Sequence, residues 1–486
     1  MWINFRAIFA VLGYLTLGIG ILMLVCSVVE LFTTQANLDN FLIIGLLLSF
    51  LGFAFAFSNN KHINSKMTLK HGFFLTTISW FWITFIASLP FYFANLNITF
   101  ASSLFEAMSA FSTTGATVFP RLEELSYGLH LWRALLQWIG GIGIILTGTA
   151  LISQLSSGGM QLFKIEAFET FDNPLDRAID IIKGIIKIYM FLTIIFFLAM
   201  WLIAGLAPFD ALMHTLTGIS TAGFSNKDAS IGFFNNYYAD IILILMMICG
   251  GSPFILIYYA VFLKKPGALL YDDQFRYFII FVVVLSLILA GWLFFYNNFS
   301  LKKSLIYGTF TIVSMMTGTG SVVADYSSWG YFPSMLILIV MFIGGCGGSS
   351  ACGMKIYRIL IAFRVSKVVM QRIFQKNHII LPYYNKTVID DQFAYSIFAY
   401  MFLMFSTIAV VALILAALGL DFITALTGSI TCLMNVGPAF GSIIGPEGTF
   451  ASLPDSAKLV LVVAMFVGRI EIFGAYVLFY RSFWQS

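Results

Sequence analysis

Long apolar stretches recur along the whole chain and are separated by short polar loops. A membrane-spanning helix needs about 20 mostly apolar residues. Ten stretches reach or approach this length, and one of them is interrupted by glycines. They cover residues 7–32, 40–58, 72–95, 129–154, 184–207, 237–263, 276–297, 332–372, 393–419 and 457–481. The pattern therefore predicts ten transmembrane helices.

Four shorter, semi-apolar stretches lie between the later spans, and each is too short to cross a bilayer. They cover residues 102–114, 209–222, 303–319 and 421–436. Irregular backbone at membrane depth is tolerated only where protein or water surrounds it. We therefore expect four re-entrant helices, each followed by a loop that returns to the side from which the helix entered.

Each re-entrant stretch runs into a polar segment that closes on a glycine. The four segments are Ser112-Thr113-Thr114-Gly115, Ser220-Thr221-Ala222-Gly223, Thr317-Gly318-Thr319-Gly320 and Met434-Asn435-Val436-Gly437. Their last residues, called the motif glycines below, are 108, 97 and 117 positions apart. Glycine beside serine or threonine is common where membrane helices pack closely. Four copies at similar spacing instead favour a repeated unit, and a ring of four backbone segments is what a cation filter needs.

The repeat leads to a prediction of the fold class: an all-α membrane protein with ten transmembrane helices. Four pseudo-symmetric repeats of span, pore helix, filter and span follow an N-terminal pair of spans. The expected boundaries are 1–69 for the N-terminal pair and 70–155, 156–264, 265–376 and 377–486 for the repeats. The inner helix of the third repeat is the interrupted one. Parallel repeats of this kind differ from the inverted repeats of many carriers.

Composition supports a membrane protein and disfavours several other classes. Hydrophobic residues make up 60% of the chain and charged residues 10%, whereas soluble proteins are about 25% charged. The net charge of +4 is spread over many loops, so we expect contact with membrane lipid and not with nucleic acid. The five cysteines form no C-x-x-C pair and are expected to be buried thiols. No catalytic constellation is evident, so we do not expect an enzyme.

Lysine and arginine concentrate in alternate loops. The basic loops are 59–71, 155–182, 264–276 and 364–391. Because basic loops stay in the cytoplasm, both termini are predicted to be cytoplasmic and the four glycine segments to open toward the outside.

The glycine segments have the chemistry of a cation site. A helix that dips in from outside directs its C-terminus, with its partial negative charge, toward the membrane interior. The returning strand offers carbonyl oxygens that replace an ion's hydration shell. Glycine permits the crowding and the unusual dihedral angles that such strands require. The predicted filter residues are Thr113, Thr114, Gly115, Thr221, Ala222, Gly223, Gly318, Thr319, Gly320, Asn435, Val436 and Gly437.

The stretch 332–372 is too long for one ordinary span and contains a cluster of glycines between Gly344 and Gly353. At about 1 kcal/mol per glycine relative to alanine, the cluster should break the helix into two halves joined by an irregular loop. A kinked helix that merely packs closely is the alternative. Residues 348–353 also imitate a phosphate loop, but Lys355 falls one place late and no strand precedes it. We therefore expect no nucleotide in this chain.

Arg469 lies about twelve residues, or about 18 Å, into the last span and so near the membrane centre. A charge at this depth is costly and is usually functional or paired. It is either an electrostatic barrier beside the pore or a structural ion-pair partner, for example of Glu471. Both interpretations remain open, and Lys355 is a second candidate for the barrier role.

Four acidic residues are candidates for the outer mouth of the pore. Glu106 and Asp210 fall near the outer starts of re-entrant helices, where an acid complements the positive helix end. They are also placed to concentrate cations. Asp325 and Glu447 follow the third and fourth glycine segments and are expected to line the vestibule or to be simply solvated.

Four segments resemble the TrkH/KtrB/HKT superfamily of potassium transporters. Residues 105–117 resemble its first filter and residues 435–438 its fourth. Residues 342–350 resemble its glycine-rich interruption and residues 468–473 its last inner helix. The resemblance runs from about residue 70 to the C-terminus. The two additional N-terminal spans resemble the branch of TrkH-type potassium uptake proteins.

The resemblance implies potassium uptake across the bacterial cytoplasmic (inner) membrane, with K⁺ as the transported ion. It also implies a homodimer and a cytoplasmic, TrkA-type nucleotide-binding regulatory subunit. The glycine-rich loop would act as a gate, with the predicted gate residues Gly344, Gly345, Gly347, Gly348, Ser349, Ser350, Lys355 and Arg469.

One departure from the family pattern falls in the third filter. Gly318 and Ser321 stand where threonine and a larger residue are frequent, which should loosen that strand. A Na⁺-permeable or Na⁺-dependent relative is therefore one alternative function. A carrier with alternating access is another.

Overall fold

The computed structural model describes residues 5–62, 69–154, 174–375, 380–385, 387–481 and 484. Most of the predicted basic loop 155–182, and part of the loop 364–391, lies outside these residues. The regular secondary structure of the described chain is almost entirely helical, which confirms the predicted all-α class. Its strands are a short antiparallel pair, β1 (Tyr383–Tyr384) and β2 (Thr387–Val388).

Each predicted re-entrant stretch forms a short helix that ends at its glycine segment. These pore helices are α4 (Phe100–Phe111), α8 (Pro208–Ile219), α13 (Leu301–Thr317) and α17 (Phe422–Met434). The helix before each pore helix is called the outer helix of its repeat. The outer helices are α3 (Leu69–Phe93), α7 (Pro174–Leu198), α12 (Asp273–Phe295) and α16 (Asp391–Ala417). A π-helical turn at Ala199–Ile203 extends α7.

The helix after each glycine segment is called the inner helix. The inner helices are α5 (Tyr127–Gln154), the pair α9 (Tyr237–Gly250) and α10 (Phe254–Val261), the pair α14 (Tyr331–Ile343) and α15 (Ile356–Phe374), and the pair α18 (Asp455–Arg469) and α19 (Glu471–Tyr476). Short helical turns occupy the connecting loops at Asn60–His62, Leu122–Glu124, Ser230–Phe234, Gly267–Leu270, Tyr326–Trp329 and Val477–Phe479.

Seven of the ten predicted spans are single helices long and apolar enough to cross a membrane. The other three are broken, and only the break between α14 and α15 was predicted. At the second break the chain turns by 105° between α9 and α10. Gly250, Gly251 and Pro253 lie there, and proline cannot donate the backbone hydrogen bond that would continue the helix. The third break separates α18 from α19 and places Glu471 at φ +56°.

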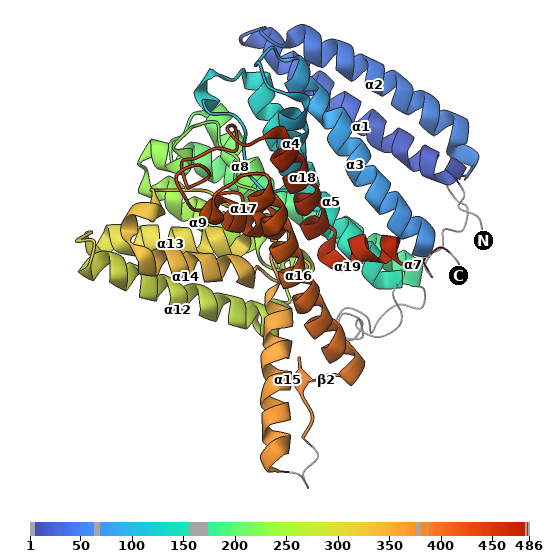
Figure 1. Ribbon diagram of the computed structural model, residues 1–486. Helices are drawn as coiled ribbons and strands as arrows, with labels where there is room; N and C mark the ends of the chain where they lie inside the picture. Colours follow the sequence, from blue (N-terminus) through green and yellow to red (C-terminus); the bar gives the residue numbers. More distant parts are fainter. Residues whose placement is uncertain are drawn as a thin grey trace.

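The N-terminal pair, α1 (Phe5–Phe32) and α2 (Leu38–Asn59), forms a hairpin beside α3 at one edge of the protein (Figure 1). The two helices touch through glycines. A Cβ atom on Gly52 would lie 2.3 Å from the Leu17 backbone nitrogen, and one on Gly13 would lie 2.5 Å from that of Ala56. Because these glycines lack side chains, the backbones approach as closely as in tightly packed membrane helices.

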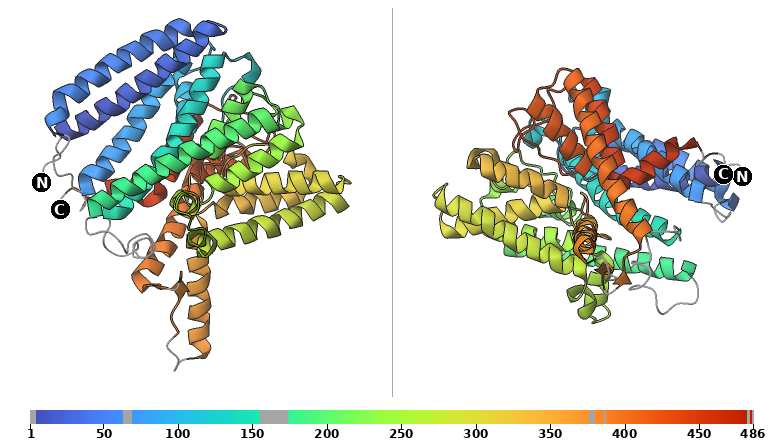
Figure 2. Two further views of the ribbon diagram at one scale, coloured as in Figure 1. Left: turned by 180° about the vertical axis from the view of Figure 1, so that it is seen from behind. Right: turned by 60° about the horizontal axis from the view of Figure 1, so that its bottom comes forward.

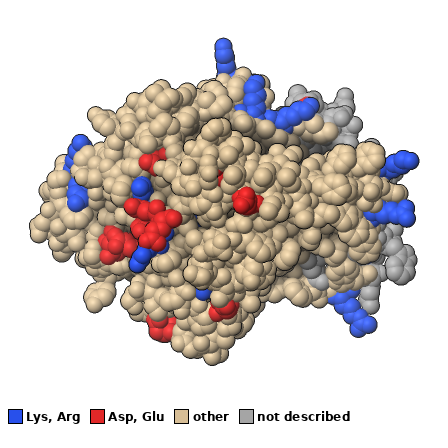
Figure 3. Space-filling view, turned by 90° about the horizontal axis from the view of Figure 1, so that it is seen from above, with Lys and Arg blue, Asp and Glu red and all other residues tan. Residues whose placement is uncertain are grey.

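Burial separates the centre of the molecule from its periphery. Ten of the twelve residues of α4 are buried. By contrast, α2 exposes large apolar side chains, with Phe50 72% and Phe57 73% exposed. The face shown in Figure 3 is mostly uncharged: acidic side chains gather left of its centre with a few basic ones beside them, and further basic side chains lie along its edges. This distribution fits pore helices enclosed by protein and outer helices in contact with lipid.

The two ends of the chain lie on the same side, because Phe74 near the start of α3 contacts both Phe5 and Trp484. In Figures 1 and 2, α15 projects beyond the rest of the protein with β1 and β2 beside it. Arg364 of α15 fixes this projection, since one guanidinium nitrogen lies 2.8 Å from an Asp273 carboxylate oxygen and 2.8 Å from the Tyr383 carbonyl.

Candidate functional site

The same backbone turn follows all four pore helices. The residue two places before each motif glycine has a positive φ, as does the glycine itself. These φ values are +55° at Thr113, +50° at Thr221, +72° at Gly318 and +52° at Asn435. The motif glycines have φ values of +84° at Gly115, +74° at Gly223, +73° at Gly320 and +99° at Gly437. Gly318 therefore makes the same turn as its three counterparts, and it does so in a conformation that is less costly for glycine.

One carbonyl in each pore helix holds this turn. This carbonyl belongs to the residue six positions before the motif glycine, and it accepts a hydrogen bond from the backbone N–H of the residue just before that glycine. The N···O distance is 2.9 Å for the carbonyls of Ser109, Thr217 and Ser314 and 3.0 Å for that of Thr431. The side-chain hydroxyl at the same position also bonds the strand in three repeats. Its acceptors are the carbonyls of Ala116 at 2.5 Å, Ser321 at 2.7 Å and Pro438 at 3.0 Å. Our sequence analysis missed these hydroxyls, although a serine or threonine precedes every motif glycine by six residues.

The four segments close into a ring. Each motif glycine faces the carbonyl oxygen of the residue that precedes a motif glycine in another repeat. A Cβ atom added to Gly115 would lie 2.3 Å from Ala222 O, and one added to Gly223 would lie 1.8 Å from Thr319 O. A Cβ atom added to Gly320 would lie 2.0 Å from Val436 O, and one added to Gly437 would lie 2.6 Å from Thr114 O. The contacts run from the first repeat to the second, third and fourth and then back to the first. The structure thus brings all twelve predicted filter residues together.

Buried polar contacts connect the ring to its surroundings. The Asn435 amide nitrogen donates to the Thr114 hydroxyl at 2.8 Å and to the Met465 carbonyl at 3.0 Å. The hydroxyls of Thr114 and Ser112 are 2.7 Å apart. These contacts tie the fourth segment to the first one and to α18, so the ring is held from behind as well as along its circumference.

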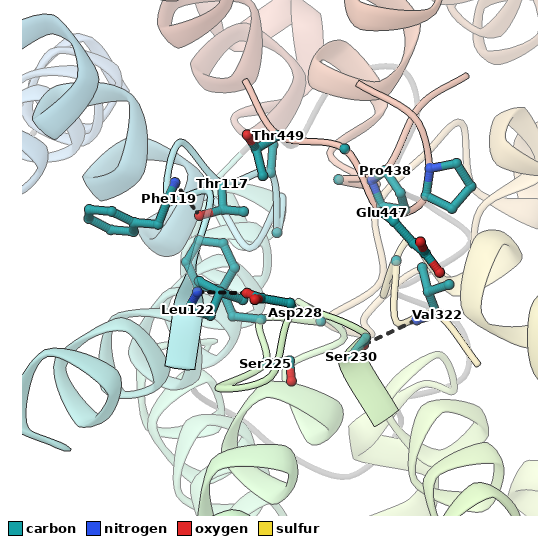
Figure 4. A pocket seen from close by; sticks show the side chains of 18 of the residues that line it. Thr117, Phe119, Leu122, Ser225, Asp228, Ser230, Val322, Pro438, Glu447 and Thr449 are labelled. Carbon is teal, nitrogen blue, oxygen red and sulfur yellow. Dashed lines mark hydrogen bonds between the residues drawn. The ribbon is translucent and has the colours of Figure 1, made fainter. Parts of the chain in front are cut away.

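A cavity lies on the side of the ring toward which the strands return, and all four motif glycines contribute to its wall (Figure 4). Asp228 and Glu447 also line it. An Asp228 carboxylate oxygen accepts from the Leu122 amide at 2.6 Å, whereas Asp325 accepts from the Ser327 amide at 2.9 Å at the start of a short helix. The predicted vestibule position is therefore confirmed for Glu447, while Asp325 caps a turn.

The glycine-rich loop, residues 344–355, approaches the ring from the side opposite the cavity, where the C-termini of the pore helices lie. The Thr221 hydroxyl lies 3.1 Å from the Ser350 hydroxyl, and the Thr113 hydroxyl lies 3.7 Å from the Cys352 sulfur. Both threonines hold the positive-φ position of their segments. The chain thus forms the predicted irregular loop between two half-helices, not a kinked continuous helix.

The glycine-rich loop is anchored in the break between α9 and α10. The Cys346 and Ser350 amides donate to the carbonyls of Gly251 and Gly250 at 2.9 and 3.1 Å. In return, the Phe254 amide donates to the Gly348 carbonyl at 3.1 Å. Backbone groups at membrane depth must be paired within the protein. The backbone N–H and C=O groups freed by the two helix breaks therefore hydrogen-bond to one another.

Arg469 ends α18 against the glycine-rich loop. Both terminal guanidinium nitrogens lie 3.3 Å from the Ser350 carbonyl oxygen, and one of them also contacts the Cys352 sulfur. The side chain is only 4% exposed. Glu471, which we considered as its partner, forms an ion pair with Arg358 instead. No described carboxylate pairs with Arg469, so the interpretation as an ion pair with Glu471 is wrong.

The remaining predicted gate residues belong to the loop itself. Gly344, Gly345, Gly347, Gly348 and Ser349 lie in it, and Lys355 closes it at the start of α15 with φ +68°. Lys355 is only half-buried, in contrast to Arg469.

Our sequence analysis did not compare the four inner helices with one another: three of them carry a glycine pair, and the fourth carries a glycine followed by an arginine. The pairs are Gly140-Gly141, Gly250-Gly251, Gly344-Gly345 and Gly468-Arg469. A Cβ atom would lie 1.9 Å from the Phe111 carbonyl oxygen on Gly140, and 1.9 Å from the Leu433 carbonyl oxygen on Gly468. In the first and fourth repeats this glycine therefore lets the inner helix touch the end of its pore helix, whereas a Cβ atom on Gly344 would lie 2.5 Å from the Cys352 carbonyl oxygen of the glycine-rich loop. Arg469 stands where the other three repeats have their second glycine.

Glu106 does not lie at the mouth of the pore, contrary to our expectation. It is fully buried in the middle of α4, and its carboxylate lies 2.8 Å from the Arg133 Nε atom of α5. It also accepts from the Val118 amide at 2.9 Å, while Arg133 donates to the Ser225 carbonyl at 2.9 Å. The pair thus joins the strands that follow the first two motif glycines. Asp210 lies in the first turn of α8, as expected, and accepts from Asn226 at 2.6 Å.

Replacing Glu106 by alanine should destabilise the protein strongly, because it leaves the Arg133 charge buried without its carboxylate partner. Breaking a buried ion pair in this way costs about 3–5 kcal/mol. Thermal unfolding of the purified protein in detergent measures the effect as a lowered melting temperature. The exposed pair Arg121–Glu124 is the control, and Glu124→Ala should change the melting temperature little. Equal effects of the two variants would contradict the prediction.

Comparisons with known proteins agree with this geometry. A sequence profile of the TrkH family, described as cation transport proteins, matches residues 38–486. The chain is 36% identical over 414 residues to the Trk system potassium uptake protein TrkI of Halomonas elongata, covering 85% of this chain and 84% of that one. It is 28% identical to TrkG of Escherichia coli, covering 99% of each. The crystal structure of the potassium transporter TrkH from Vibrio parahaemolyticus superposes with a TM-score of 0.90 at 30% identity, covering 99% of this chain and 100% of that one. The chain therefore belongs to the TrkH family of cation transport proteins.

Proposed function

We propose that this protein takes up K⁺ across the bacterial cytoplasmic membrane through the ring formed by its four glycine segments. The observation that carries the proposal is the closed sequence of contacts between each motif glycine and a carbonyl of another repeat. The relatives named as potassium uptake proteins support K⁺ as the ion. The repeat boundaries given above remain part of this proposal.

Backbone carbonyls of the twelve filter residues replace the hydration shell of the ion. The C-termini of α4, α8, α13 and α17 all end at the ring, and each carries about −0.5 elementary charge. Four such ends favour a monovalent cation without any acidic side chain in the ring. Glu447 and Asp228 bring carboxylates to the outer cavity, where Lys227 and Arg133, which is paired with Glu106, also contribute to the wall.

The glycine-rich loop closes the path on the other side of the ring. It places Ser350 and Cys352 against the first two filter segments and holds Arg469 beneath them. A buried positive charge opposes the passage of a cation. We propose that Arg469 and, less directly, Lys355 keep the resting path shut, and that movement of the loop opens it.

Regulation would come from the cytoplasmic side, where the basic loops predict that both termini lie. The projecting helix α15 exposes Phe363 and Phe374, together with Lys367. Such a mixed apolar and basic surface is suited to a protein partner. We propose that a TrkA-type nucleotide-binding subunit docks there, and that the chain itself forms a homodimer.

Ion flux into liposomes tests the proposed function. The purified chain should carry Rb⁺, as a substitute for K⁺, down its gradient and should carry Na⁺ more slowly. Equal rates for the two ions would favour the Na⁺-permeable alternative. Uptake that is slow, saturable and coupled to a second ion would favour a carrier. Absence of any Rb⁺ flux from folded protein, with or without a nucleotide-binding subunit, would contradict the proposal.

A further inference from the structure

Gln137 of α5 is fully buried and reaches across a boundary between repeats. Its amide nitrogen donates to the Ala222 carbonyl at 2.9 Å, and its amide oxygen accepts from the Phe224 amide at 3.1 Å. Gln137 belongs to the first repeat, whereas both partners belong to the second glycine segment and flank its motif glycine, Gly223. One side chain therefore holds the second segment on both sides of its motif glycine.

The Ala222 carbonyl is also the one that faces Gly115. A Cβ atom on Gly115 would lie 2.3 Å from this oxygen. A carbonyl oxygen has two lone pairs, so it can accept from Gln137 and still face an ion. Gln137 thus acts on an atom of the ring itself, at the boundary between the first and second segments.

Among the described residues, the other three inner helices show no side-chain contact of this kind with a ring carbonyl. Gln137 precedes Gly140 by three positions, and the residues three positions before Gly250, Gly344 and Gly468 are methionines. These are Met247, Met341 and Met465, and all three are buried. A methionine side chain offers no N–H group to a carbonyl. Asn435 supplies an amide near the fourth segment, yet it donates to the Thr114 hydroxyl, not to a carbonyl of the ring.

We propose that Gln137 is a positioning residue that sets the width of the ring at the Ala222 carbonyl and so contributes to the discrimination of K⁺ from Na⁺. The inference rests on the proposed function. A smaller ion is favoured when carbonyls can move inward to contact it. Gln137 restrains one carbonyl and the following strand from behind. Hydroxyl groups of the pore helices hold the strands of the first, third and fourth segments, whereas in the second segment Gln137 holds the ring carbonyl itself.

Replacing Gln137 by methionine tests this role, because methionine stands at the corresponding sequence position in the other three repeats and is buried there. We expect the ratio of Rb⁺ to Na⁺ uptake in liposomes to fall about tenfold, which corresponds to about 1.4 kcal/mol. Rb⁺ uptake itself should persist. If Gln137→Met does not fold, Gln137→Glu preserves the shape and the acceptor for Phe224 but removes the donor to Ala222. It should lower the ratio in the same direction.

The control removes a buried amide far from the ring. Asn37 is 6% exposed and donates to the Ser126 hydroxyl at 3.0 Å. Asn37→Leu should lower the melting temperature and leave the ion ratio unchanged. An ion ratio within twofold of the wild type in the Gln137 variants, whatever their melting temperature, would overturn the inference. A wild-type protein without preference for Rb⁺ would instead overturn the proposed function, so the two failures are distinguishable.

Discussion

Replacing Gly223 by alanine should abolish selective Rb⁺ uptake. The residue has φ +74°, and a Cβ atom there would lie 1.8 Å from the Thr319 carbonyl oxygen. Alanine therefore requires both a strained backbone and a shift of an adjacent ring carbonyl. Strain of this kind costs about 1–3 kcal/mol before the clash is counted. Because the displaced atom is a proposed ion ligand, we expect uptake to fall about a hundredfold or more.

Gly291→Ala is the matched control for this prediction. Gly291 lies in α12, and no atom lies within 4 Å of a Cβ placed there. Its substitution should leave both uptake and the melting temperature close to those of the wild type. Selective uptake by folded Gly223→Ala protein at the wild-type rate would show that the ring is not the ion path.

Features that recur along the chain could be predicted from the sequence. The motif glycines, the pore helices and the break before α15 each depend on local composition: a short apolar stretch, a polar segment or a cluster of glycines. Local composition also explains why all four segments make the same turn, since Gly318, with its φ of +72°, matches its counterparts. The break between α9 and α10 had a local signal too, in Gly250, Gly251 and Pro253, but the surrounding apolar residues outweighed it in our reading.

Contacts between distant segments could not be predicted in the same way. Glu106 meets Arg133 and Gln137 meets Ala222 across 27 and 85 positions of sequence, respectively. No periodicity links the members of either pair. An acidic residue in a pore helix was therefore assigned to the mouth, where charges are usually solvated. Burial, which made an ion pair necessary, became apparent only when α4 was placed against α5.

Comparison of the four repeats makes Arg469 the most informative position of the proposed gate. Gly141, Gly251 and Gly345 stand at the corresponding sequence position of the other repeats, so three of the four inner helices have no side chain there. The arginine is thus not required by the packing of an inner helix as such. Its contacts are with the glycine-rich loop, through the Ser350 carbonyl and the Cys352 sulfur.

Replacing Arg469 by alanine should raise basal Rb⁺ flux in the absence of any regulatory subunit. At an effective dielectric constant of about 20, two like unit charges about 8 Å apart repel each other by about 2 kcal/mol, and removing such a barrier changes a rate about thirtyfold. Liposome flux measures this change directly. Arg469→Lys retains the charge and should retain most of the barrier, while Arg469→Gly restores the residue of the other repeats and should behave like alanine. A lower melting temperature without a higher flux in the alanine and glycine variants would assign Arg469 a structural role alone. Loss of an electrostatic barrier raises the flux, whereas loss of a structural contact lowers the melting temperature.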